Sequence, residues 1–177
     1  MTATSYPSDG RTTLGEALYT FQSARELFES AREASRDAER IRNQLMAMES
    51  AADGLGGSGM TQRVSSTGEP DRMAGRVASL VDREEMLRRR QDEDYALIDL
   101  ANRVLYGEDG RSGLWVLAGW RADALALHYL NGETWGVVGR LLGYSEQYVW
   151  QQAQVALDLC DGWGLVSVMA GTGGAEG

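Results

Sequence analysis

The sequence predicts an all-α protein, with a long helical hairpin or coiled coil followed by a C-terminal three-helix helix-turn-helix unit. Two long segments repeat apolar residues every three or four positions, which is typical of amphipathic helices. Neither segment shows the apolar–polar alternation of a half-buried strand. Near the end of the chain, a helical pattern, a glycine-containing turn and a further helical pattern follow one another, and this order predicts a helix-turn-helix.

The first long segment runs from residue 14 to residue 52, after a flexible N-terminus of residues 1–13. Neither proline nor glycine interrupts it between Gly15 and its end, so we expect one continuous helix. Its apolar and small positions are Leu14, Leu18, Phe21, Ala24, Phe28, Ala31, Ala38, Ile41 and Leu45.

The second long segment covers residues 71–106 and is predicted to follow a mobile linker. Glycine and serine dominate this linker at residues 53–70. Asp71 is suited to cap the helix that follows. At 1.5 Å per residue, each long helix would measure roughly 50–60 Å, so the two can fold back on each other or pair between subunits. The apolar positions of the second helix are Met73, Val77, Leu80, Val81, Leu87, Tyr95, Ile98, Ala101 and Leu105.

Residues 111–166 are predicted to form the helix-turn-helix domain, and residues 167–177 a flexible tail. The first helix of the domain is expected over residues 114–130, after a turn rich in glycine and acidic residues. Two further helices would then complete the unit within the domain. The short apolar stretch after Trp163 is followed by glycines, which indicates a chain end that frays.

The turn of the motif is marked by small residues. Val138 and Leu142 lie four apart on one face of the middle helix, and Gly139 leaves room for a second backbone to approach. Gly143 sits where a C′ glycine would end that helix, and Ser145 is suited to cap the next one. The buried side of the third helix is predicted to contain Val149, Ala153, Ala156 and Leu157.

The charge of the chain is unusual for a protein that binds nucleic acid. The net charge is −9, and all seventeen basic residues are arginine. Residues 120–160 hold two arginines against four carboxylates, a net charge of −2. The Arg88–Arg90 run is flanked by acidic residues at helical spacing, such as Glu84 before Arg88 and Asp94 after Arg90, which favours a solvated helix face. Binding to DNA would therefore need focused arginines, a partner such as RNA polymerase, or dimerisation.

Residue types that carry catalysis are scarce, and we expect neither an enzyme nor a cofactor. His128 is the single histidine and Cys160 the single cysteine, so no zinc cluster and no internal disulfide is expected. Gly54, Gly56 and Gly59 spell a dinucleotide motif, but a helix rather than a strand is expected before them. No apolar run reaches spanning length and the N-terminus does not resemble a signal peptide, which predicts no membrane partner and a cytoplasmic location.

The run YLNGETWGVVGRLLGYSEQYV resembles region 4 of bacterial sigma factors, which reads promoters. It is more similar to phage-encoded ArpU-type late transcription regulators, which also place helices before such a motif. This resemblance implies that the third helix enters the major groove of DNA and that the protein acts in the bacterial host cell. In similar proteins the third helix usually carries Arg or Lys, whereas here it carries Gln. The positions implied are Glu146, Gln147, Tyr148, Gln151 and Gln154 near bases, with Ser145 or Arg140 near phosphate.

The expected function is that of a phage or prophage-type transcription regulator that reads a promoter as a homodimer or higher homo-oligomer. Its expected partners are double-stranded DNA and the host RNA polymerase. One alternative is a DNA-packaging component similar to a small terminase, which also combines a helix-turn-helix with oligomerising helices. Another is an acidic helical adaptor, with a degenerate helix-turn-helix, that engages a basic protein.

Overall fold

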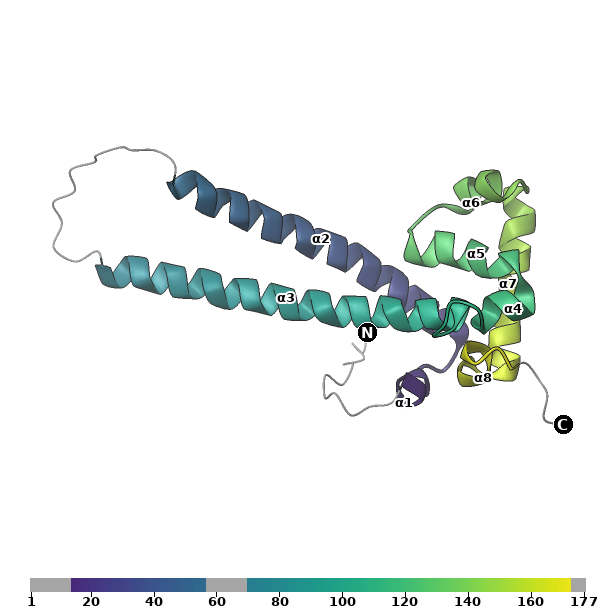
Figure 1. The fold of residues 1–177 in the computed structure, drawn as a ribbon. Helices are drawn as coiled ribbons and strands as arrows, with labels where there is room; N and C mark the ends of the chain where they lie inside the picture. Colours follow the sequence, from purple (N-terminus) through teal and green to yellow (C-terminus); the bar gives the residue numbers. More distant parts are fainter. Residues whose placement is uncertain (1–13, 57–69, 173–177) are drawn as a thin grey trace. The chain divides into compact units, whose positions relative to one another are not determined.

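The computed structural model describes residues 14–56 and 70–172, and every element in that part of the chain is a helix (Figure 1). The all-α prediction is therefore confirmed for these residues. They divide into two compact units: unit 1 comprises residues 14–36 and 93–172, and unit 2 comprises residues 37–56 and 70–92. No helix within the described ranges is long and apolar enough to cross a membrane.

The predicted continuous helix over residues 14–52 begins at Leu14 as expected, but it is interrupted near its start and continues beyond its predicted end. A short helix, α1 (Leu14–Leu18), is separated by five residues from α2 (Ala24–Gly56). Ser23 explains the break, because its Oγ accepts a hydrogen bond from the backbone N–H of Glu26 at 3.2 Å. The Glu26 carboxylate in turn accepts from the backbone N–H of Gln22 at 2.7 Å. This reciprocal pairing resembles a capping box and starts a new helix.

The predicted linker also needs correction, because α2 continues through its first four residues to Gly56. Gly54 and Gly56 therefore lie in a helix, while Gly59 and the rest of residues 57–69 lie outside the described part of the chain. α3 (Pro70–Tyr106) begins with proline at its first position, where the missing N–H costs no hydrogen bond. Its bounds agree with the predicted 71–106 to within one residue.

The predicted helix over residues 114–130 is divided into three elements. These are α4 (Gly113–Ala118), α5 (Trp120–Leu125) and η1 (Ala126–Leu130), which is one turn of π-helix. Gly119 separates the first two, with a φ of +58° that a continuous α-helix does not contain. The sequence pattern alone did not indicate this break, because the apolar spacing continues across it.

Three further helices complete unit 1. α6 (Trp135–Leu142) and α7 (Glu146–Trp163) are followed by α8 (Leu165–Met169), and α7 contacts α4, α5, α6 and α8 along its length (Figure 1). The prediction of a flexible tail from residue 167 is wrong at its start, since Val168 is fully buried in α8. Residues 173–177 lie outside the described part of the chain.

The core of unit 1 joins the first turns of α2 to the last turns of α3 and to the C-terminal helices. A smaller cluster of Ala124, Val138 and Val149 lies between α5, α6 and α7, with Trp135 and Leu142 packed against it. Burial of the predicted apolar positions is thus confirmed for Val138 on α6 and Val149 on α7, which are fully buried. Leu142, on the same face of α6 as Val138, is half-buried. The largest fully buried side chains of the core include Phe28, Leu100, Leu105, Leu114, Leu125 and Leu157.

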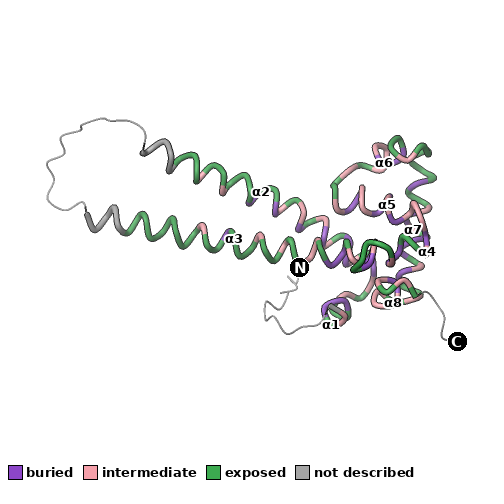
Figure 2. Tube along the Cα trace, in the orientation of Figure 1, coloured by how far each residue is buried: buried purple, intermediate pink, exposed green. Residues whose placement is uncertain are grey.

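Unit 2 consists of the parts of α2 and α3 that lie between residues 37 and 92. Ile41 and Leu87 are buried, and the Arg90 guanidinium contacts the Asp37 carboxylate at 2.6 Å. Arg88 pairs with Glu84 at 2.7 Å, as the spacing predicts. The first half of α3 remains largely exposed (Figure 2), and its exposed apolar side chains are Val77, Leu80, Val81 and Met86.

Candidate nucleic-acid interface

The turn between α6 and α7 has the geometry that its residue types predict. Gly143 adopts the left-handed conformation with φ +77°, and the next N–H, that of Tyr144, donates to the Gly139 carbonyl at 2.8 Å. Ser145 caps α7, because its Oγ accepts from the backbone N–H of Tyr148 at 3.3 Å. Both predicted caps are therefore confirmed, and together they fix the direction in which α7 leaves the turn.

Gly139 allows α6 to approach this turn closely. A Cβ atom at Gly139 would stand 2.8 Å from the Tyr144 carbonyl oxygen and 3.2 Å from the Glu146 nitrogen. Both neighbours are backbone atoms, which cannot rotate away as a side chain would. The predicted role of Gly139 is confirmed, and the small residue determines how tightly α6 and α7 meet.

Sequence reasoning missed the residue that starts α6. Thr134 has an extended backbone, and its Oγ1 accepts from the backbone N–H of Val137 at 3.4 Å. Threonine is a common N-cap residue, so its place directly before Trp135 was the available signal. All three boundaries around the turn therefore carry a local cap.

The outward side of α7 presents two of the predicted base-contacting residues. Gln147 and Gln151 are exposed and lie one turn apart, away from the buried Val149 and Ala153. Val155 follows Gln151 by one further turn and is 49% exposed. Sequence reasoning missed Val155, although its four-residue spacing from Gln151 places it on the same side of the helix.

Two other predicted base-contacting residues lie against neighbouring helices. The Glu146 carboxylate is so close to α6 that a Cβ atom at Gly136 would stand 3.1 Å from its Oε2. That position is in the first turn of α6, where the helix dipole favours a negative charge. The Gln154 Oε1 accepts a hydrogen bond from the Arg25 guanidinium on α2. The Gln154 hydrogen bond therefore links α7 to α2, while Glu146 lies exposed at the start of α7.

Tyr148 belongs to a cluster of aromatic rings on the rim of the turn. Its ring centroid lies 6.0 Å from that of Trp120 and 5.4 Å from that of Tyr144, and the Trp120 and Tyr144 rings stack at 4.6 Å. Arg121 lies 5.7 Å from the Trp120 ring centroid, and its Nε donates to the Gln152 Oε1 at 2.7 Å. These contacts direct the Arg121 guanidinium along the protein surface.

Cations are few on this side of unit 1. Arg140 is exposed near the end of α6, and Ser145 is exposed at the start of α7. Both predicted phosphate-contacting residues are therefore accessible to solvent. The Ser145 oxygen already accepts from the backbone, but its hydroxyl proton remains a donor that can meet a phosphate oxygen.

A buried histidine connects α2 to the loop that starts α6. The Arg32 Nη1 lies 2.8 Å from the Nε2 of His128, and the Nδ1 of His128 lies 2.7 Å from the Glu133 carbonyl oxygen. The ring also stacks on Trp135 with centroids 3.8 Å apart. Burial, helped by the nearby charges of Arg32 and Arg36, lowers the pKa of His128 to about 4 against the opposing effect of the Glu133 hydrogen bond.

His128 is consequently neutral at pH 7. Only one tautomer then satisfies both contacts: the Nδ1–H donates to the Glu133 carbonyl, and Nε2 accepts from Arg32. Ser35 adds a third connection, since its Oγ donates to the Leu130 carbonyl at 2.8 Å. The first turns of α2 therefore position the loop from which α6 begins.

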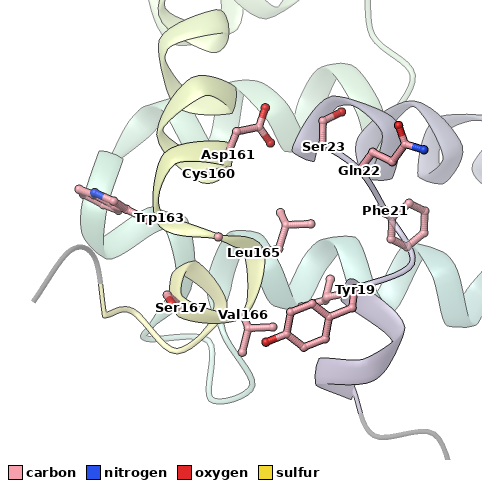
Figure 3. A pocket seen from close by; sticks show the side chains of 12 residues that line it. Tyr19, Phe21, Gln22, Ser23, Cys160, Asp161, Trp163, Leu165, Val166 and Ser167 are labelled. Carbon is pink, nitrogen blue, oxygen red and sulfur yellow. The ribbon is translucent and has the colours of Figure 1, made fainter. Parts of the chain in front are cut away.

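A cavity of about 320 Å³ lies in unit 1 beside α1, the end of α7 and α8 (Figure 3). Tyr19 and Val166 lie next to each other at one end of it, and Asp161 and Ser23 lie at the other. The Asp161 Oδ1 accepts from the backbone N–H of Ala24 at 2.6 Å, so α7 caps the start of α2. Burial raises the pKa of the Cys160 thiol to about 12, and the thiol stays protonated at neutral pH.

Within the described ranges, no three His, Cys, Asp or Glu side chains gather as a metal site requires. The exposed side of α7 presents the amide groups of Gln147 and Gln151, directly after the capped turn. A comparison of the chain with protein-family models, with curated proteins and with solved structures finds no match.

Proposed function

We propose that this chain is a phage or prophage-type transcription regulator that binds promoter DNA through a sigma-like helix-turn-helix. In this proposal α5 and η1 support the motif, α6 crosses the DNA backbone, and α7 lies in the major groove. The observation that carries the proposal is the capped turn from Gly143 to Ser145, which holds α7 with Gln147 and Gln151 exposed. Amide side chains on an exposed helix can form hydrogen bonds with base edges.

The low positive charge implies weak binding by a single copy. Arg140 is exposed, whereas the Arg121 guanidinium is hydrogen bonded to Gln152. Because phosphate contacts supply most of the affinity that is independent of sequence, one copy should bind random duplexes weakly. The salt dependence of specific binding should be shallow for the same reason.

A second copy of the chain would supply the missing affinity. The exposed Val77, Leu80 and Val81 form one apolar patch on α3, since they follow a spacing of three and four residues. Pairing of this patch between copies, with α2 and α3 forming a helical hairpin, would present two DNA-reading helices at once. Two linked helices bind DNA more tightly than either alone, because the second contact forms within the same complex. Host RNA polymerase is the further partner proposed.

The test is a double substitution on the exposed side of α7. In Gln147→Ala/Gln151→Ala, the melting temperature should stay unchanged, since both side chains are exposed and alanine favours helix. Specific binding to a DNA sequence selected from the phage genome should weaken by about 1–3 kcal/mol per lost base contact. Gln44→Ala, at an exposed position of α2, is the matched control and should bind as the wild type does. Undiminished binding by the double variant would exclude α7 as the DNA-reading helix.

An acidic protein adaptor is the second candidate function. Leu141 and Trp150 are exposed on α6 and α7, and the net charge of −9 suits a basic protein partner. If no sequence is enriched from the phage genome, even with host RNA polymerase present, the adaptor becomes the better proposal. A ring-shaped oligomer in mass measurements would instead favour a packaging component.

A further inference from the structure

We infer that α7 recognises a short run of A·T base pairs, with Gln147 and Gln151 directed at adenines and Val155 at a thymine methyl group. This inference rests on the proposed DNA-binding function and names the bases that it reads. The three side chains are defined here as the reading ridge. Each follows the previous one by four residues, so they form one row along the outward side of α7.

The reading ridge has the length of a short base-pair run. At 1.5 Å per residue, its ends are separated by about 12 Å along the helix axis. Neighbouring base pairs are stacked about 3.4 Å apart, so the row corresponds to about three or four of them. Beyond it, α7 continues to the exposed Asp158, whose negative charge disfavours closer contact with phosphates.

The chemistry of the ridge matches the major-groove edges of A·T pairs. A glutamine amide offers one acceptor and one donor group, which pair with the N6 and N7 atoms of adenine. Valine offers only methyl groups, and the apolar group in the major groove is the C5 methyl of thymine. Against the polar edge of a G·C pair, Val155 would leave a base donor or acceptor without a partner, and that loss is costly.

The side chains that most often read G·C pairs are missing from the reading ridge. Guanine is most often recognised by arginine or lysine, and α7 contains neither from Glu146 to Trp163. Cytosine can donate to a carboxylate, but the ridge itself contains none, since Glu146 precedes it and Asp158 lies beyond it. Gln154 is hydrogen bonded to Arg25, so it is not part of the ridge.

The first experiment selects binding sites for the full chain from a random duplex pool. An enriched motif with three or four successive A·T pairs supports the inference. Enrichment of a motif whose contacted positions are G·C overturns the inference but leaves the DNA-binding function standing. Enrichment of no sequence, with or without host polymerase, overturns the proposed function and the inference together. The two failures are therefore distinguishable.

The second experiment tests Val155 through the methyl group itself. Each thymine of the selected site is replaced in turn by deoxyuridine, which pairs identically but lacks the C5 methyl. Wild-type affinity should fall roughly fourfold at one thymine, as expected for loss of one buried methyl contact. Val155→Ala should bind thymine and deoxyuridine equally at that position. Val116→Ala, an exposed valine of α4, is the matched control and should retain the wild-type difference. Wild-type insensitivity at every thymine overturns the assignment of Val155.

The third experiment changes the base that is read. Gln151→Arg should shift the selected base at one position from adenine to guanine, because arginine pairs with the O6 and N7 atoms of guanine. The same substitution at the exposed Gln44 should leave the selected motif unchanged. If Gln151→Arg raises affinity for all sequences alike, Gln151 faces phosphate and its assignment to adenine is overturned.

Discussion

Unit 1 and unit 2 contain stretches of the same two long helices, yet they bury them to very different extents. In unit 1, Leu27, Phe28, Leu100 and Val104 are completely buried, because helices from the C-terminal part of the chain cover them. In unit 2, Ile41 and Leu87 are buried, but Val81 is 48% exposed and Leu80 more so. Along α2 the apolar spacing continues from unit 1 into unit 2, and Val77, Leu80 and Val81 follow it on α3, although residues 82–94 of α3 are mostly charged. An apolar stripe therefore becomes a core only where a further layer of helices covers it.

The largest expected effect comes from a charge placed in the covered region. Val138→Asp should unfold unit 1, because an unpaired carboxylate at a fully buried site costs about 4 kcal/mol or more. All five tryptophans lie in unit 1, so tryptophan fluorescence during denaturation reports on it selectively. Val81→Asp in unit 2 is the matched control and should leave that transition unchanged. An equal loss of stability from both substitutions would remove the contrast between the units.

The second effect is a pH dependence located in unit 1. The pKa of His128 in the folded protein, about 4, lies below its ordinary value of 6.5. The His128 side chain therefore binds a proton more tightly in the unfolded chain than in the folded protein. Its contribution to the free energy of unfolding is complete above about pH 6.5 and is lost as the pH falls towards 4. The expected loss is about 2–3 kcal/mol in urea denaturation. His128→Gln should flatten this part of the profile, whereas an unchanged slope would show that carboxylates cause it.

The third effect is a difference in stability between two glycine-to-alanine substitutions, one in each unit. Gly139→Ala should destabilise unit 1 by about 1–3 kcal/mol, because the new Cβ would stand 2.8 Å from a backbone oxygen. Gly75→Ala in α3 should stabilise that helix by about 0.5–1 kcal/mol, since no atom lies within 4 Å of the added carbon. Circular dichroism during thermal unfolding measures both variants. Destabilisation by Gly75→Ala would indicate that a partner covers the side of α3 opposite the patch of Val77, Leu80 and Val81.

The smallest effect concerns the cap of α7. Ser145→Ala removes the oxygen that accepts from the Tyr148 N–H and should cost about 1 kcal/mol in fluorescence-monitored denaturation. Ser79→Ala, at an exposed position inside α3, should be neutral or slightly stabilising. A neutral result for Ser145→Ala would mean that packing alone fixes the start of α7.

Local features of the fold could be predicted because they depend on neighbouring residues. The left-handed Gly143 and the Ser145 cap follow from residue type, and the buried side of α7 follows from helical spacing. The breaks near Ser23 and Gly119 were missed because apolar spacing continues across them. Ser23 with Glu26 did give a local signal, the S-x-x-E pattern of a capping box.

The candidate site was predictable only where its side chains are exposed. Helical spacing was sufficient to place Gln147 and Gln151 on one side of α7. It could not show that Gln154 meets Arg25, 129 residues earlier in the chain, or that Tyr148 stacks near Trp120. Such contacts depend on tertiary packing, and they give Gln154 and Tyr148 partners within unit 1 that helical spacing does not reveal.

The hydrogen bond from the Ala24 N–H to Asp161 joins residues 137 positions apart. During synthesis, the first turns of α2 are made long before α7, so the start of α2 must wait without its final cap and core partners. Contacts of such sequence separation slow folding and leave apolar surface exposed meanwhile. The C-terminal helices are equally incomplete without α2, since Phe28 and Leu27 belong to their core. A fragment of residues 107–172 should therefore be digested by a protease far faster than the same residues within the whole chain, where residues 14–36 and 93–106 complete the core of unit 1.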